Sequence, residues 1–285
     1  LALIGESGSG KTMTALSVLR LISPPAAITG GRVLYRGQDI VSLSVEAMRK
    51  LRGKRLAMIF QNPRDRFDPL RTMSSQLVEV LLYHHVCKSR RDANERALTL
   101  LEEVQVAQAQ RVLRMYPNEL SGGMLQRVLI AIAVAASPDV LIADEPTSAL
   151  DVTIQAEILD LLLELQRSRG MTMLFITHDI GVAQQVADAV AVMYAGQIVE
   201  QGAASDVLVQ PRHPYTQALL AAVPKSGADR LTPIPSASVG GRPEGCRFAP
   251  RCVRASEHGK ASIPPPFFQA GSVAVRCWLY AGPDS

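Results

Sequence analysis

A run of eight residues near the start of the sequence, GESGSGKT, has the residue types and spacing of a phosphate-binding loop. Its glycines let backbone N–H groups point inward, and the helix that follows presents its positive end to an anion. In such a loop Lys11 reaches the β- and γ-phosphates, and the Thr12 hydroxyl binds Mg²⁺. A glycine-rich turn can give the same string by chance, so this interpretation needs support from further residues that could bind Mg²⁺. The expected phosphate-binding residues are Gly5, Glu6, Ser7, Gly8, Ser9, Gly10, Lys11 and Thr12.

A pair of acidic residues provides that support. The apolar run VLIAD ends in Asp144, and Glu145 follows directly. In phosphate-loop enzymes an Asp at the end of a strand holds Mg²⁺, which is the role expected of Asp144. Glu145 is then placed to polarise the attacking water. Two solvated acids at a strand end would be the ordinary explanation if the phosphate loop were absent.

A second anion-binding feature follows from LSGGM, residues 120–124. Ser121 is a natural N-cap, and Gly122 and Gly123 permit a close approach of the backbone at the start of a helix. Such a helix terminus binds anions, yet one nucleotide does not need two cradles. The physical solution is a dimer in which the second cradle of each chain closes on the phosphates bound by its partner.

The elements that must position these groups alternate between strand and helix, which predicts a mostly parallel sheet covered on both faces. The segments 55–61 and 140–145 are predicted strands, and an apolar stripe at helical spacing contains Ile158, Leu161, Leu162 and Leu165 and stops near Gly170. A helix is predicted for residues 11–22, a turn at Gly37 and a hairpin that turns at Gly196. A helical block of about residues 62–138 is expected to be an inserted subdomain. From residue 225 Pro, Gly, Ser and Cys dominate. We therefore predict a main domain of residues 1–224 and an extension of residues 225–285.

Five motifs in this order, GESGSGKT, LSGGM, ADEP, SALD and THD, resemble the nucleotide-binding subunit of an ATP-binding-cassette (ABC) transporter. The resemblance covers residues 1–224. It implies an α/β P-loop NTPase fold, an ABC nucleotide-binding domain with an inserted helical subdomain and a small irregular C-terminal extension. It implies an ATPase that uses ATP and Mg²⁺.

The same resemblance gives roles to further residues. Gln61 matches the glutamine that senses Mg²⁺ and contacts the membrane partner, so it joins Thr12 and Asp144 at the metal. Residues 148–151, which end in Asp151, match the loop that crosses a dimer interface. His178 matches the histidine that contacts the γ-phosphate, and acts with Glu145 and Gln61 in catalysis. Members of the family usually carry about two more strands and an adenine-stacking aromatic before the loop, so we expect a natural N-terminus to be missing.

Finer features narrow the choice of transporter. Met124, where Gln is commoner, and the segments QNPRDRFDPL and HPYTQALL resemble the ATPases of dipeptide, oligopeptide and nickel importers. The extension favours peptides, while RVLRMYPNELSGGMLQR favours nickel. This resemblance implies a peripheral subunit on the cytoplasmic face of the inner (plasma) membrane. Its partners would be a second ABC ATPase subunit, identical or not, two transmembrane permeases that dock near residues 64–70, and, indirectly, a substrate-binding protein.

Two other classes of function remain as alternatives. An ABC ATPase acting on nucleic acid or ribosomes would suit the net charge of +4, but the Lys and Arg residues are scattered without aromatic interleaving, so no nucleic-acid partner is expected. A regulatory cassette that binds ATP without hydrolysis often lacks Glu145 or His178, and both are present here. No apolar run reaches the roughly 20 residues that span a bilayer.

Three of the four cysteines, Cys246, Cys252 and Cys277, lie in the extension, whereas Cys87 stands alone in the helical block. The resemblance implies a four-cysteine site for an iron–sulfur cluster in such extensions, and thiolates suit a cluster. At the expected position of the fourth cysteine this sequence has Gly259, beside His258. Three alternatives stay open: a cluster with another fourth ligand, a Cys₃His zinc site, or metal-free cysteines packed as small apolar residues.

Overall fold

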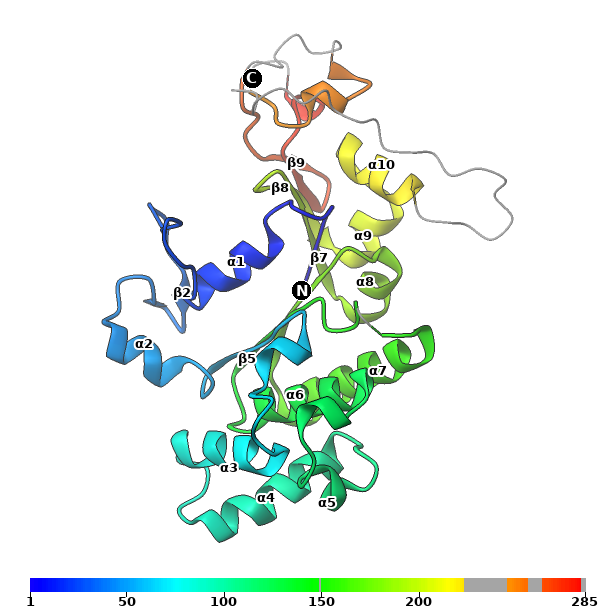
Figure 1. The fold of residues 1–285 in the computed structure, drawn as a ribbon. Coiled ribbons are helices and arrows are strands. Elements are labelled where there is room, and N and C mark those ends of the chain that lie inside the picture. Colours follow the sequence, from blue (N-terminus) through cyan, green and yellow to red (C-terminus); the bar gives the residue numbers. More distant parts are fainter. Residues whose placement is uncertain (149, 223–244, 256–262, 283–285) are drawn as a thin grey trace. The chain divides into compact units, whose positions relative to one another are not determined.

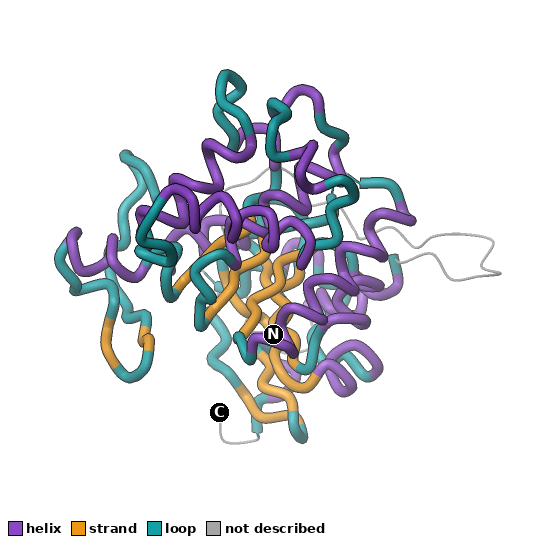
Figure 2. The backbone as a smooth tube through the Cα atoms, turned by 90° about the horizontal axis from the view of Figure 1, so that it is seen from below, coloured by secondary structure: helices purple, strands orange, loops and turns teal. Residues whose placement is uncertain are grey.

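The computed structural model describes residues 1–148, 150–222, 245–255 and 263–282. The chain forms two compact units, one of residues 1–14 and 175–285 and the other of residues 15–174. We call them the terminal unit and the middle unit. The alternation of strands and helices along the chain can be followed in Figure 2. The domain boundary expected near residue 225 lies outside the described residues.

The sheet of the middle unit consists of two buried parallel strands, β4 (Leu56–Ile59) and β5 (Val140–Asp144), and of residues 172–174 of strand β6 (Thr172–Thr177). Strand β4 pairs with β5, and Ile59 lies opposite Ala143. Both strands are apolar because helices cover the two faces of a parallel sheet. A separate hairpin joins β2 (Leu34–Tyr35) to β3 (Gln38–Asp39), with Gly37 in its turn at φ +81°, as the sequence predicts.

The helical block of the middle unit consists of helices that pack on one another (Figure 1). The apolar stripe of α4, at Ala97, Leu100 and Leu101, is fully buried. Gly170, in the left-handed conformation at φ +61°, ends α7 where the sequence predicts a stop. The helices of the middle unit after α1 are α2 (Val45–Leu51), α3 (Met73–Tyr83), α4 (Arg90–Glu103), α5 (Ala109–Val112), α6 (Gly122–Val134) and α7 (Val152–Arg169), with 3₁₀ turns η1 (Pro63–Arg66) and η2 (Pro117–Glu119).

Helix α1 (Lys11–Val18) ends four residues before the sequence pattern suggests. The helix signal continues to Ile22, but Arg20 has a φ of +51° and breaks the helix. The guanidinium of Arg52 donates hydrogen bonds to the carbonyls of Leu19 (2.7 Å) and Arg20 (2.8 Å). These bonds satisfy carbonyls that a continued helix would otherwise have used.

The terminal unit is built around β1 (Ala2–Ile4), which pairs in parallel with β6 (Thr172–Thr177) on one side and β7 (Ala189–Tyr194) on the other. Strand β8 (Gln197–Ala203) returns antiparallel to β7 after a turn at Ala195 and Gly196, both with positive φ. This hairpin is the one predicted from the sequence. The helices of this unit are α8 (Ile180–Val186), α9 (Ala204–Val209) and α10 (Pro214–Ala221).

The described part of the extension adds regular structure that the sequence pattern does not reveal. Strand β10 (Val273–Val275) pairs antiparallel with β8, and β9 (Phe268–Ala270) pairs with β10. Two 3₁₀ turns accompany them, η3 (Ala249–Arg251) and η5 (Trp278–Tyr280). Phe248 and Val273 enter the apolar core of the terminal unit beside Ile4, Val192 and Tyr215. The extension is therefore irregular only in part, and its apolar residues share a core with β1 and β7.

Candidate functional site

The predicted phosphate loop lies between β1 and α1, as its pattern requires. Gly5 has a φ of +155°, and a Cβ added there would stand 2.2 Å from the carbonyl oxygen of Met193. Only glycine fits so close to the β7 backbone. Ser9 accepts a 2.7 Å hydrogen bond on its carbonyl from the N–H of Gly196. The hairpin of β7 and β8 therefore supports the loop from the strand side.

Lys11 is buried and holds the loop from within. Its ammonium donates hydrogen bonds to the carbonyls of Gly5 (2.8 Å) and Glu6 (3.0 Å). Ser7, Gly8 and Thr12 are exposed, whereas Ser9 is buried. Within the described residues the Ser9 hydroxyl has no hydrogen-bond partner. An unmet buried donor suits a loop whose ligand brings phosphate oxygens, because such groups are otherwise paired.

His178 lies at the same edge of the sheet as the loop. Ile4 and Thr177 are register partners on the parallel strands β1 and β6, and the loop and His178 follow them directly. Asp179 caps α8 by accepting the N–H of Val182 at 3.2 Å, and His178 is left exposed on the loop before it. The structure thus brings His178 to the edge where Gly5 begins the phosphate loop.

Asp144, Glu145 and Gln61 lie in the middle unit. Asp144 is the last residue of β5 and is 1% exposed. Glu145 follows in the left-handed region at φ +47° and accepts a 2.8 Å hydrogen bond on Oε2 from Gln61 Nε2. Gln61 comes shortly after β4, and neighbouring parallel strands end at the same edge of the sheet. The structure therefore joins Gln61 to Glu145, two residues that the sequence named separately.

The second cradle begins as predicted. The Ser121 hydroxyl accepts the N–H of Met124 at 3.3 Å and caps α6. A Cβ on Gly123 would lie 2.9 Å from Cγ2 of Ile154, so the start of α6 packs tightly on α7. Asp151 caps α7 by accepting the N–H of Ile154 at 3.0 Å. Between Ser148 and Asp151, residue 149 lies outside the described part of the chain.

A hollow of about 250 Å³ brings several of these residues together. It is lined by Gln61, Asn62, Pro63, Arg64, Gly122, Gln126, Pro146 and Leu150. Gln126 is 2% exposed, and its Nε2 has no hydrogen-bond partner among the described residues. The place of Gln126 in this hollow could not be predicted from the sequence, because a glutamine on an apolar helix carries no spacing signal. The hollow joins the loop after β4 to the start of α6.

The three cysteines of the extension lie near one another. Burial, with a smaller contribution from the neighbouring Cys246 and Cys252, raises the pKa of the Cys277 thiol to about 11. Cys246 and Cys252 pack against the core of the terminal unit. Among the described residues no group of three or more His, Cys, Asp or Glu side chains is arranged to hold a metal ion. His258 and Gly259 lie outside those residues.

Comparison with known proteins identifies the family. A family model described as ABC transporter matches residues 1–148, and one described as Oligopeptide/dipeptide transporter, C-terminal region, matches residues 199–258. The oligopeptide transport ATP-binding protein OppD of Bacillus subtilis (strain 168) is 45% identical, with 98% of this chain and 79% of the relative aligned. The chain belongs to the ABC transporter family.

Other members of the ABC transporter family agree with this assignment. A provisionally named peptide import ATP-binding protein of Brucella melitensis biotype 1 is 46% identical over 93% of this chain and 82% of its own length. A solved dimeric structure of the ATP-binding cassette MJ0796, in a post-hydrolysis state with ADP and Pi, superposes with a TM-score of 0.63. It is 29% identical and covers 71% of this chain and 84% of that one. The cassette fold of this ABC chain is thereby shown.

The matched C-terminal region of this ABC transporter chain contains the tripeptide His213-Pro214-Tyr215 at the start of α10. Nδ1 of His213 accepts the N–H of Tyr215 at 3.0 Å, and Pro214 occupies the first turn, where no N–H is needed. Glu200 accepts the N–H groups of Arg212 (2.6 Å) and His213 (3.0 Å). Burial lowers the pKa of His213 to about 4, against a smaller opposing effect of a hydrogen bond with the Arg276 backbone. At pH 7 the His213 imidazole is therefore uncharged, and it serves as the cap of α10.

No helix in the described ranges of this ABC transporter chain combines the length and apolar content needed to cross a bilayer.

Proposed function

We propose that this chain is the ATP-hydrolysing subunit that powers an importer of dipeptides or oligopeptides. The observation that carries the proposal is the phosphate loop, which is held by Lys11 and by the β7–β8 turn at the edge that also presents His178. The peptide cargo rests on the names of the two relatives and on the matched C-terminal region. Nickel, the alternative cargo within the same group, is tested in the transport experiment below.

The proposed roles of the loop residues follow from their contacts. Backbone N–H groups of the loop, the Ser9 hydroxyl and the Lys11 ammonium bind the phosphates of ATP, and His178 contacts the γ-phosphate. Lys11 exchanges its bonds with the carbonyls of Gly5 and Glu6 for bonds with phosphate oxygens, which are better acceptors for an ammonium. The loop is thus already shaped around the lysine before the nucleotide arrives.

The proposed metal-side roles use the two acids at the end of β5 and Gln61, which follows β4. Asp144, Thr12 and Gln61 would hold Mg²⁺, and the buried carboxylate of Asp144 is the hard oxygen ligand this ion requires. When bound, Mg²⁺ neutralises charge that develops on the transferred phosphoryl group. Glu145 accepts a proton from the attacking water, and the amide of Gln61 fixes the orientation of its carboxylate.

We propose further that the active form is a dimer of cassettes. Ser121, Gly122 and Gly123 at the start of α6 would bind the γ-phosphate held by the partner chain. The loop that ends in Asp151 would cross the same interface. Support comes from the helix N-terminus at the start of α6, whose dipole favours an anion, and from a related cassette, MJ0796, which was solved as a dimer. Binding of two nucleotides closes this dimer, and their hydrolysis reopens it.

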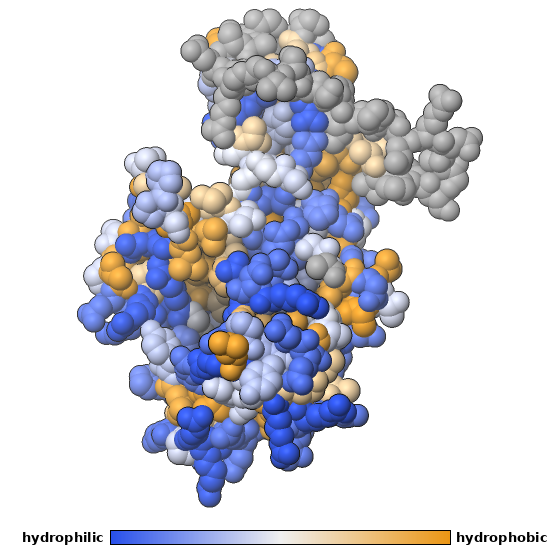
Figure 3. All heavy atoms as spheres, in the orientation of Figure 1, coloured by the Kyte–Doolittle hydropathy of each residue, from blue (hydrophilic) through white to orange (hydrophobic). Residues whose placement is uncertain are grey.

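The permease docks, in this proposal, on the segment 64–70 and on α3. Leu70 is 85% exposed and Tyr83 is 56% exposed, so apolar side chains remain for a partner. An open hollow of about 470 Å³ lies between them along α3, lined by Arg71, Ser75, Val78, Glu79, Leu82, Tyr83 and Arg90. In Figure 3 the surface over the helical block is mainly hydrophilic with isolated apolar patches. Docking would place the chain on the cytoplasmic face of the membrane.

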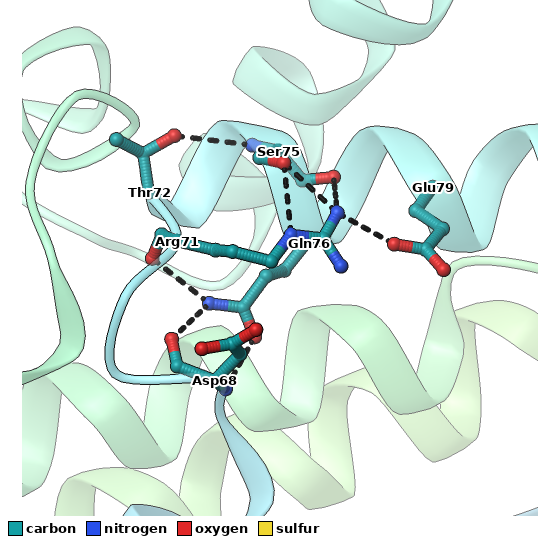
Figure 4. A network of polar contacts seen from close by, with 6 residues as sticks. All are labelled: Asp68, Arg71, Thr72, Ser75, Gln76 and Glu79. Atoms are coloured by element: carbon teal, nitrogen blue, oxygen red, sulfur yellow. Dashed lines mark hydrogen bonds and ion pairs between the residues drawn. The ribbon is translucent and has the colours of Figure 1, made fainter.

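A polar network holds this segment in shape (Figure 4). Gln76 donates to the carbonyls of Asp68 (3.1 Å) and Arg71 (3.0 Å) and accepts the N–H of Asp68 (2.9 Å). Arg71 in turn pairs with Glu79 at 2.6 Å and with the Ser75 hydroxyl. Residues 68–71 are therefore tied to α3, within the surface proposed for the permease.

Reconstitution with the two permeases in vesicles tests the proposed function. We expect ATP-driven uptake of labelled peptides and no uptake by a complex that carries Glu145→Gln. Uptake of Ni²⁺ without peptide uptake would overturn the proposed cargo. Charge-reversing changes at Arg64, Arg66 and Asp68 should uncouple hydrolysis from uptake, whereas intact coupling would contradict the docking assignment.

We also propose that Cys246, Cys252 and Cys277 are the thiolate ligands of an iron–sulfur cluster in the extension. The support is their spacing within the family resemblance and the mutual vicinity of the three thiols. The described residues supply no fourth ligand, so a cluster needs one from elsewhere. Anaerobic purification should give iron, sulfide and absorbance near 400 nm, all lost in Cys252→Ser. Zinc without sulfide would indicate a Cys₃His site, and a stable metal-free protein would indicate plain packing.

A further inference from the structure

Three separate elements converge on Glu6, the second residue of the phosphate loop. Its carboxylate accepts two hydrogen bonds from the guanidinium of Arg251, both at 2.8 Å. Its N–H donates to the hydroxyl of Tyr215 at 2.8 Å. Its carbonyl accepts the ammonium of Lys11 at 3.0 Å. All of these residues belong to the terminal unit, and the Lys11 bond connects Glu6 to the residue that binds phosphate.

Arg251 is fixed in place by its surroundings. Its side chain is 13% exposed, and its guanidinium carbon lies 5.5 Å from the ring centre of Tyr194 and 5.9 Å from that of Phe248. Phe248 is itself 3% exposed and packs on Tyr215 with ring centres 5.5 Å apart. The pair with Glu6 is therefore a bidentate contact on a rigid base, unlike an exposed ion pair between two mobile side chains.

Tyr215 adds a second attachment from another element. It lies in the first turn of α10, is fully buried, and packs on Tyr194 at 4.7 Å between ring centres. The His213 cap and the proline before Tyr215 fix the start of α10, so the phenol hydroxyl has little freedom. The extension therefore binds the side chain of Glu6 through Arg251, and α10 binds the backbone N–H of Glu6 through Tyr215.

We propose that Arg251 and Tyr215 are positioning residues for the phosphate loop, through which the C-terminal extension sets the affinity for the triphosphate. The inference rests on the proposed nucleotide role of the loop. Holding Glu6 holds the carbonyl that Lys11 contacts, and so keeps Lys11 and the loop in the arrangement that receives phosphates. A loop released from Arg251 has to be ordered by the nucleotide itself, and this ordering weakens binding. Neither residue touches the reacting atoms, so the chemical step is unaffected.

A double-mutant cycle in the full-length protein tests the inference. Glu6→Gln removes the negative charge at unchanged side-chain length, and Arg251→Met removes the guanidinium but keeps an unbranched side chain. We expect each to raise the Kd for Mg·ATP, measured by calorimetry, and the KM about tenfold, within the range of coupling between linked sites. Arg251→Met should leave kcat within about twofold. The double variant should bind no more weakly than either single variant, and Arg251→Lys should recover part of the loss.

Arg276→Met is the matched control. Arg276 is an arginine of the same extension, but its guanidinium contacts the carbonyls of Ile198 (3.2 Å) and Pro265 (3.3 Å) and the ring of Phe267, away from the loop. It should leave the Kd unchanged. An equal loss of affinity in Arg276→Met would show general loosening of the extension and overturn the proposal.

Two further results would overturn it: single variants that bind as wild type, or losses that simply add. Lys11→Ala distinguishes a failure of the positioning role of Arg251 from a failure of the proposed nucleotide role of the loop. A lost affinity in Lys11→Ala with normal affinity in Arg251→Met rejects only the positioning role, whereas normal affinity in both rejects the loop assignment as well. If Arg251→Met does not fold, as thermal melting would reveal, Glu6→Gln decides, because it alters the loop side alone.

Discussion

Glu145 adopts a backbone conformation that is rare for a residue with a side chain. Its φ of +47° lies in the left-handed region, which costs roughly 1–3 kcal/mol for residues other than glycine. Strain of this size persists where surrounding contacts determine the conformation, and here the Gln61 amide holds the carboxylate while the Ser148 hydroxyl donates to the Glu145 carbonyl at 3.1 Å. A glutamate with this backbone, directly after a buried aspartate, is better explained by a function than by stability.

The proposed role of Glu145 as a general base predicts a specific defect. Glu145→Gln keeps the hydrogen bond with Gln61 possible but cannot accept a proton, so kcat should fall by about 10²–10⁴-fold. Binding of Mg·ATP should persist. Phosphate release and nucleotide titration measure the two quantities. Glu164→Gln, the same change at an exposed position of α7, should behave as wild type. Wild-type turnover in Glu145→Gln would refute the assignment.

Burial of Cys277 predicts slow reaction with thiol reagents in metal-free protein. With a pKa of about 11, roughly 0.1% of the thiol is ionised at pH 8, because each pH unit is a factor of ten. The half-exposed Cys87 of the middle unit is the internal comparison. Labelling with a chromogenic disulfide and mass spectrometry should find Cys87 modified well before Cys277. The opposite order would contradict the buried, neutral thiol.

At the scale of elements, the two glycines that start α6 differ in what surrounds them. A Cβ on Gly123 would meet Cγ2 of Ile154 at 2.9 Å, whereas one on Gly122 would lie 3.7 Å from Leu150. Since Ile is β-branched and stiff, the first contact cannot relax without a shift between α6 and α7. The glycine requirement at the second cradle is therefore partly one of packing.

Gly123→Ala should accordingly lower the free energy of unfolding by about 1–3 kcal/mol, the usual range for an overpacked contact. Gly122→Ala should be neutral or slightly stabilising, because alanine favours helix. Urea unfolding of both variants measures the difference. Equal stabilities would mean that the helices shift apart freely at this point.

The cap residue of helix α10, His213, makes the free energy of unfolding depend on pH. Unfolded histidine takes up a proton below a pKa of about 6.5, whereas His213 in the folded chain does so only near pH 4. Between these values the unfolded state binds more protons, so stability rises with pH and is lost as the pH falls from 6.5 towards 4. The full effect of His213 is roughly 3 kcal/mol at order of magnitude.

Urea unfolding at several pH values measures this effect as the difference between wild type and His213→Asn, which keeps a capping side chain without the titration. Glu200 has a pKa raised by burial and acts in the opposite direction, but it is present in both proteins. Stability that changes with pH identically in the two proteins would contradict a buried neutral His213.

The sequence predicted elements well where a local residue decides the geometry. Ser121 as a cap, Gly170 as a helix end and Gly196 in a turn all lie where expected. It failed where partners are distant in the chain. Strand β10 is three residues long and becomes a strand only by pairing with β8, and the Glu6–Arg251 pair joins residues 245 positions apart. No spacing rule spans that distance, so residue types alone could not pair them.

At the scale of the whole molecule, the role proposed for the second cradle requires a second chain. Glu145→Gln should bind ATP without releasing it, and so hold the dimer closed. Sedimentation with Mg·ATP is expected to give twice the mass of the chain, and with Mg·ADP the mass of one. Ser121→Arg, which blocks the start of α6, should remain at the single mass with either nucleotide. A Glu145→Gln protein that stays a single chain at saturating ATP would reject the dimeric cycle.

The contacts of Glu6 with Tyr215 and Arg251 have a consequence for biosynthesis. Two of its partners, Tyr215 and Arg251, follow it by 209 and 245 positions. At the usual 5–20 residues per second, a ribosome needs roughly 10–50 s to travel from Glu6 to Arg251. During that time the loop exists in the cell without either attachment. A nascent or prematurely ended chain would therefore carry the phosphate-loop sequence and hold ATP weakly. Only a finished chain would compete for the nucleotide.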